Sequence, residues 1–269
     1  MDILREYFGI GGYQRTPEGA YSWQHLTFVG ALMALMVGLA VWLGLRNRHR
    51  DNRDKNRVLC WAAILIDGLE LIKIGIACWS QEQSGYPWYH GVLYNLPLFL
   101  CSIQLIAIPL AAFTTGRLKE AALDFVSIFG LLGAVAGTVG AAQNYNCYPV
   151  LGFDNMVSGF THCISGFAAL YILIAGMASM QRKNVPLTFA ILLTFAGGAF
   201  VANAGLDYNY MFLRRGDGTP YDILYNLVEG DPVWYPVGVM ALFVGYILLF
   251  YAGYYLATKS KKDKEPVTV

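Results

Sequence analysis

The sequence predicts an all-α integral membrane protein, a single transmembrane domain of seven helices that covers residues 1–269. Two observations lead to this prediction. The chain is 56% hydrophobic and only 14% charged, whereas soluble domains carry about 25% charged residues. Its apolar residues also gather in stretches of about 20 residues, the length at which a helix crosses a bilayer. The spans and their connections use nearly the whole chain, so we expect no second, soluble domain.

Charged or turn-forming residues bound each predicted span, as they usually bound membrane helices. The third span contains Pro97, and a proline inside a helix tends to kink it. The fourth is rich in glycine (Gly130, Gly133, Gly137), which favours close packing of helix backbones in lipid. In chain order, the spans cover residues 24–45, 58–79, 91–113, 121–142, 157–179, 186–206 and 234–258.

The connections between the spans predict the orientation in the membrane. Fourteen Lys and Arg residues lie on one side, in the segments 46–57, 114–120, 180–185 and 259–269. Only four lie on the other side: Arg5, Arg15, Arg214 and Arg215. Because cytoplasmic loops carry an excess of Lys and Arg, we expect the N-terminus outside and the C-terminus in the cytoplasm.

Composition and missing motifs exclude several classes of function. The net charge is +1 and no basic stripe is present, so we expect no nucleic-acid partner. The last span has no Lys for a retinal Schiff base, and no phosphate-binding loop, HExxH motif or clustered cysteine pairs occur. We therefore expect no metal and no organic cofactor. Cys78 and Cys147 both lie near the outer surface in this topology, and a disulfide between them stays open.

Polar residues inside the spans are the candidates for a site, because such groups are costly in hydrocarbon. Glu70 and Lys73 are three residues apart in the second span, so they share a helix face and can pair. Such a pair either pins the bundle, or orients a ligand headgroup or tunes a neighbouring histidine.

A cysteine and a histidine lie toward the outer side of two other spans. Cys101 lies about 15 Å deep by helix rise, and Gln104 shares its face. His162 lies about one turn inside the fifth span. Together Cys101 and His162 have the residue types of a thiol nucleophile and its base. The plain alternatives are a small buried cysteine and an interior histidine that bonds to a carbonyl or to Ser165.

Further polar residues lie at the outer ends of the first and sixth spans. His25 opens the first span, and Asn203 and Asp207 are four residues apart at the end of the sixth. We expect these side chains to position or polarise a substrate ester. The alternative for Asn203 and Asp207 is an ordinary helix end, where both residue types are common.

Four stretches of the chain resemble the YwaF-type integral membrane proteins of bacteria. They are Trp23-Gln24-His25, the run Leu96-Pro97-Leu98-Phe99-Leu100-Cys101-Ser102, His162, and Asn209-Tyr210-Met211-Phe212-Leu213 followed by Pro232-Val233-Trp234-Tyr235. The resemblance covers nearly the whole chain in the same order. That family is grouped with the animal transmembrane protein 164, a phospholipid acyltransferase. One departure is Phe99, where the bacterial motif has a histidine.

The resemblance implies a thiol acyltransferase in a bacterial plasma membrane, with Cys101 and His162 as its catalytic pair. Membrane phospholipids or lysophospholipids would be its substrates, and Asn209 would join the supporting residues. The residues themselves leave acyl transfer and acyl hydrolysis equally open. A second interpretation is a non-catalytic transporter or receptor, in which the same cluster binds a small polar solute in an outward-facing cavity. The sequence says nothing about the oligomeric state.

Overall fold

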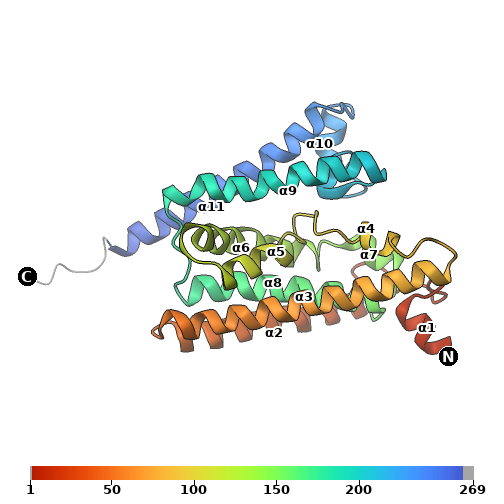
Figure 1. Cartoon of the computed structure of the whole chain (residues 1–269), viewed down its shortest axis with the longest axis horizontal. Helices are drawn as coiled ribbons and strands as arrows, with labels where there is room; N and C mark the ends of the chain where they lie inside the picture. Colours follow the sequence, from red (N-terminus) through yellow and green to blue (C-terminus); the bar gives the residue numbers. More distant parts are fainter. Residues whose placement is uncertain (1, 263–269) are drawn as a thin grey trace, which may run out of the picture. The chain divides into compact units, whose positions relative to one another are not determined.

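A computed structural model describes residues 2–262, and every regular element in that part of the chain is helical (Figure 1). Contacts between the elements divide the chain into two compact units, residues 1–178 and residues 179–269. The helices of the first unit are α1 (Asp2–Phe8), α2 (Trp23–Asn47), α3 (Asn52–Gln83), α4 (His90–Leu93), α5 (Gln104–Phe113), α6 (Gly116–Ala136), α7 (Ala142–Cys147) and α8 (Phe153–Ile174).

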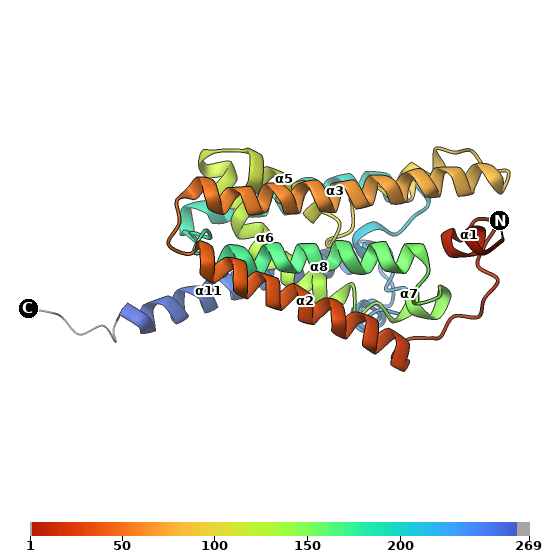
Figure 2. The same ribbon diagram turned by 90° about the horizontal axis from the view of Figure 1, so that it is seen from below.

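Helix α8 is the centre of the first unit. It packs against α2, α3 and α6, and α5 packs against α3 and α6 (Figure 2). Small residues allow the close approaches. A side chain at Gly44 of α2 would overlap Ile174 of α8, and one at Gly166 of α8 would overlap Met36 of α2. The elements that will carry the candidate site therefore meet within one bundle.

Polar residues start the two long helices of this bundle. The Ser22 hydroxyl accepts the backbone N–H of His25 at 3.3 Å at the start of α2. The Asp51 carboxylate accepts the backbone N–H of Asp54 at 3.0 Å at the start of α3. Each bond satisfies a donor that the helix itself cannot satisfy. Helix α2 begins one residue before its predicted span, at Trp23, whereas α3 begins six residues before its predicted span, at Asn52.

The predicted helix over residues 91–113 is not continuous. The chain forms only the short α4, then turns over residues 94–103, and becomes regular again in α5. Pro97 has no N–H to donate and disfavours helical geometry in the residue before it. The Asn95 side chain also bonds the Gly91 carbonyl at 2.8 Å, which gives the backbone a partner outside a regular helix. The expected kink is thus a full break of the helix.

The predicted helix over residues 121–142 starts earlier and ends earlier than expected. Helix α6 begins at Gly116 and ends at Ala136, and α7 starts after a turn. Glycines at 137 and 140 explain the early end, because glycine weakens a helix and favours its termination.

The second unit contains the remaining elements. They are η1 (Arg182–Asn184), α9 (Val185–Leu206), η2 (Tyr210–Phe212), α10 (Tyr221–Leu227) and α11 (Trp234–Lys262). The hydroxyl groups of Thr188 on α9 and Tyr251 on α11 are hydrogen-bonded at 3.1 Å, so the two long helices are joined by a polar contact.

Four helices among the described residues are long and apolar enough to cross a membrane. They lie at Trp23–Asn47, Phe153–Ile174, Arg182–Leu206 and Trp234–Thr258 and match four of the predicted spans. Large apolar side chains are left exposed on them, such as Trp42 on α2, which suits a lipid environment. The other predicted crossings fall on α3 and α6, which carry charged side chains, and on the broken segment. Seven spans and the orientation therefore stay predictions.

Candidate active site

Cys101 lies on the irregular segment just before α5. Its carbonyl oxygen accepts the backbone N–H of Gln104, the first residue of α5, at 3.3 Å. The thiol is half-buried. The amino end of a helix carries unpaired N–H groups and partial positive charge. The break in the helix therefore places a thiol at a helix start instead of within a regular helix.

His162 lies on α8, and its hydrogen bonds define which ring nitrogen carries the hydrogen. Nδ1 is 2.7 Å from the Ser158 carbonyl oxygen and 3.3 Å from the Ser158 hydroxyl. A carbonyl oxygen can only accept, so Nδ1 is the protonated nitrogen of the neutral ring. Nε2 is then left with a free lone pair. This is the arrangement in which an imidazole can take a proton from a neighbour.

The Cys101 thiol and the His162 ring lie close enough for electrostatic interaction. Because Nδ1 is held by Ser158, Nε2 is the nitrogen that faces the thiol. The two residues come from segments that are 61 positions apart, so only the packing of the bundle joins them.

Two glycines of α6 form the surface on which this pair lies. A Cβ atom at Gly133 would lie 3.3 Å from Cβ of Cys101, and one at Gly137 would overlap Cδ2 and Nε2 of the His162 ring. The glycines are four residues apart and share a face of the helix. The sequence predicted a packing face for them. It did not indicate that their partners are the candidate thiol and imidazole.

Gln104 is completely buried, and neither its amide nitrogen nor its amide oxygen has a hydrogen-bond partner in the structure. Such groups are rare, because a buried polar group without a partner loses its bonds to water and gains none. Gln104 follows Cys101 by three residues in the sequence. It is a predicted supporting residue whose side-chain donors and acceptor are all unused.

His25 differs from His162 because both of its ring nitrogens have partners. Nδ1 accepts the backbone N–H of Tyr21 at 2.9 Å, and Nε2 bonds the Thr138 carbonyl at 3.3 Å. The ring is fully buried and stacks on Tyr145 at 3.8 Å between centroids. His25 therefore anchors the turn that follows Gly137, and its nitrogens are not free to polarise an ester.

Glu70 and Lys73 form an ion pair on α3, with an oxygen–nitrogen distance of 2.5 Å. Lys73 lies close enough to His162 and to Asp154 for electrostatic interaction with both. Asp154 in turn accepts a hydrogen bond of 3.0 Å from the Tyr13 hydroxyl. A charged group that includes Asp154, which was not a predicted site residue, thus lies near the histidine.

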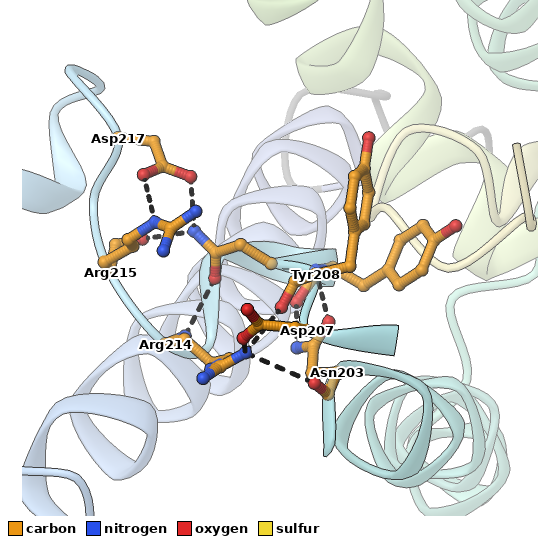
Figure 3. Close-up of polar contacts among 8 residues, drawn as sticks. Asn203, Asp207, Tyr208, Arg214, Arg215 and Asp217 are labelled. Carbon is orange, nitrogen blue, oxygen red and sulfur yellow. Dashed lines mark hydrogen bonds and ion pairs between the residues drawn. The ribbon is translucent and has the colours of Figure 1, made fainter. Parts of the chain in front are cut away.

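Asn203, Asp207 and Asn209 belong to the second unit, in a closed network around a loop (Figure 3). The Asn203 amide donates to the Tyr210 carbonyl at 3.0 Å and accepts the Tyr210 N–H at 2.6 Å. Arg214 donates to the Asp207 carboxylate at 2.5 Å. These side chains hold a loop through its own backbone, which is the plainer of the two interpretations of Asn203 and Asp207.

Asn209 extends the same network. Its amide nitrogen donates to the Arg215 carbonyl and to the Asp217 carboxylate, both at 2.8 Å, and its oxygen accepts the Arg214 N–H at 2.9 Å. Every polar atom of this side chain therefore has a partner within the loop.

Ser158 and Gly137 are the contacts of His162 that were not among the predicted site residues. The signal for Ser158 was its position four residues before His162 on one helix, within reach of the ring.

All five cysteines are free thiols, including Cys78 and Cys147. Within residues 2–262, no group of three or more His, Cys, Asp or Glu side chains is arranged to hold a metal.

Comparison with known proteins gives one match. No curated protein and no solved structure matches the chain. The model of the TMEM164 family matches residues 20–257, which include every predicted site residue. The narrower grouping with YwaF-type proteins stays a prediction. With its apolar helices and this match over most of its length, the chain is a multi-pass membrane protein that belongs to the TMEM164 family.

Proposed function

We propose that this protein is a thiol-dependent phospholipid acyltransferase, in which Cys101 carries the acyl group and His162 moves the protons. The observation that carries the proposal is that Cys101 and His162 lie against Gly133 and Gly137 on one face of α6, with Nδ1 of the ring tied to Ser158. A thiol paired with an oriented imidazole is the usual arrangement of a cysteine nucleophile. Membership of the TMEM164 family adds support.

The proposed reaction has two half-reactions that use the same two side chains. In the first, Nε2 of His162 takes the thiol proton, and Sγ of Cys101 forms a bond to the ester carbonyl carbon. The carbon–oxygen ester bond then breaks, and the departing lysolipid oxygen takes the proton from His162. In the second, the hydroxyl of another lysophospholipid gives its proton to His162 and attacks the thioester. The carbon–sulfur bond breaks, Sγ of Cys101 takes the proton from His162, and the diacyl lipid leaves.

The proposal includes the membrane setting. In it, α3, the broken segment and α6 also cross the cell membrane, which gives seven crossings with the N-terminus outside. Irregular backbone at membrane depth is tolerated where it is covered by protein or lines a cavity, and residues 95–102 are partly covered by the rest of the protein. Phospholipids would enter from the outer leaflet, and the Glu70–Lys73 pair would meet the headgroup.

The test is thioester formation on Cys101. Purified protein in detergent is incubated with a phospholipid whose acyl chain carries an alkyne, and the label is detected on the protein before and after hydroxylamine. We expect a hydroxylamine-sensitive label that Cys101→Ala abolishes. Cys163→Ala is the matched control, because this thiol lies on α8 next to His162, is buried, and should leave the label unchanged.

Labelling that survives in Cys101→Ala would overturn the proposal. A transporter or receptor for a polar solute would behave differently again. It would keep binding its solute in Cys101→Ser and lose binding in Lys73→Met, because the charged pair and not the thiol would hold the solute.

A further inference from the structure

Gln104 is the most unusual polar group of the first unit. A primary amide offers two N–H donors and an oxygen with two lone pairs. All of this capacity is buried, and none of it is used within the protein. Its neighbours along the chain are apolar and buried as well: Ile103 just before α5, and Ala107 and Ile108 on α5. An alkyl side chain would suit these surroundings better, so the amide needs an explanation outside the fold itself.

The position of Gln104 relates it to Cys101. The backbone N–H of Gln104 bonds the Cys101 carbonyl, which closes a tight turn between the two residues. Cys101 in turn lies against Gly133, and His162 lies against Gly137, one helical turn further along the same face of α6. Gln104 therefore begins α5 within one turn of the residue that carries the thiol.

We propose that the side-chain amide of Gln104 donates a hydrogen bond to the acyl carbonyl oxygen when Cys101 attacks. This inference rests on the proposed acyltransferase function and adds the group that binds the oxyanion. As the Sγ–carbon bond forms, the π electrons of the carbonyl move onto oxygen, and an N–H of Gln104 stabilises that negative charge. When the ester bond breaks, the carbonyl re-forms and the hydrogen bond weakens. The amide gains and loses no proton.

The chemistry of an amide suits this role. It is neutral, so it leaves the thiol proton to His162 and adds no charge to an apolar site. A fixed donor stabilises developing charge more strongly than water does, because it does not have to reorient. A glutamate of the same shape would offer acceptors only when ionised and would repel an oxyanion. The carbonyl of a lipid ester, a donor-free acceptor, is the partner that such an amide lacks in the free protein.

Gln104→Met tests the inference, because methionine keeps the length of the side chain and removes both donors. We expect kcat for acyl transfer to fall by about 10²–10³-fold, the usual effect of removing one oxyanion donor, with little change in KM. Thermal stability should stay equal or rise, because an unpartnered buried amide is replaced by an apolar group. Gln143→Met is the matched control, since Gln143 is exposed on α7 and should not affect kcat.

A second measurement separates this role from a merely structural one. Alkylation of Cys101 by iodoacetamide depends on the thiolate but forms no oxyanion, so its rate should be the same in wild type and Gln104→Met. A variant that keeps its kcat would overturn the inference. So would a variant in which alkylation falls together with acylation, because Gln104 would then only hold the thiol in place. Absence of any Cys101 acylation in the wild type would overturn the proposed function and this inference together. An unchanged kcat, or a parallel fall of alkylation and acylation, in Gln104→Met would overturn only the role of Gln104.

Discussion

Two polar clusters of this apolar chain differ in how far their hydrogen bonds are satisfied. In the loop of the second unit, Asn203 binds both backbone groups of Tyr210, and Asn209 binds the loop with its nitrogen and its oxygen. In the first unit, the Cys101 thiol lies close enough to the His162 imidazole for electrostatic interaction, and the side-chain amide of Gln104 has no hydrogen-bond partner. The polar groups in the loop of the second unit therefore bond one another, whereas the cluster in the first unit keeps unused hydrogen-bonding capacity.

The difference separates polar residues that build the fold from polar residues that are available to a ligand. A buried polar group without a partner destabilises the fold, so its presence needs a use, whereas a fully bonded one is explained by the structure it holds. The same contrast separates two histidines of the first unit, His25 and His162. His25 uses both nitrogens for backbone groups, and His162 uses only Nδ1 in that way.

The largest effect is expected at His162, and it would test the contrast between the two histidines. His162→Gln removes the base, and the rate of acyl transfer should fall by about 10²–10⁴-fold. His25→Gln should mainly lower the melting temperature, because it weakens the bonds to Tyr21 and Thr138. Rates and melting curves are measured for both variants. If His25→Gln lost the activity and His162→Gln kept it, the assignment of roles would be reversed.

A smaller effect is expected from Gly137→Ala, which sharpens the contrast by moving the imidazole without removing it. The new Cβ would overlap the His162 ring, so the ring must shift away from Cys101. A displacement of about 1 Å can cost about 10²-fold in rate. The matched control is Gly38→Ala in α2, where a Cβ meets no atom within 4 Å. Equal rates for the two variants would show that the packing of the ring on α6 does not position it.

The smallest effect is expected at the closed loop. Asn203→Ala removes the hydrogen bonds of the Asn203 amide to the backbone N–H and C=O of Tyr210, which should destabilise the protein by about 1–3 kcal/mol. The iodoacetamide reaction of Cys101 should keep its rate. Asn226→Ala on the exposed face of α10 is the matched control for stability. A loss of Cys101 acylation in Asn203→Ala with unchanged melting would instead indicate a part in substrate binding.

Much of the helical framework could be predicted from the sequence. Helices α2, α8, α9 and α11 lie close to their predicted spans, because a long apolar window can only be satisfied as a helix in lipid. The pairing of Glu70 with Lys73 followed from their spacing on one helix. The break at residues 94–103 was predicted only as a kink. Pro97 indicates where the helix is distorted, but it does not indicate how many residues lose helical geometry.

The candidate site was predicted by residue type, and its geometry was not. Cys101, Gln104 and His162 stood out because polar groups are rare within apolar stretches. Asn203 and Asp207 stood out for the same reason, yet they bond within their own loop, where Asp207 takes a left-handed conformation with φ of 49°. Sequence alone does not distinguish a satisfied polar group from an open one, since partners come from residues distant along the chain.

By itself, the sequence determined that the chain is a helical membrane protein with polar residues at a few positions, because hydropathy and local spacing act over short stretches. Only the tertiary structure decided that Cys101 meets His162, that two glycines of α6 make room for them, and that Gln104 stays without a partner. Those features depend on the packing of α5, α6 and α8 against one another, and no local pattern encodes which side chains such packing brings together.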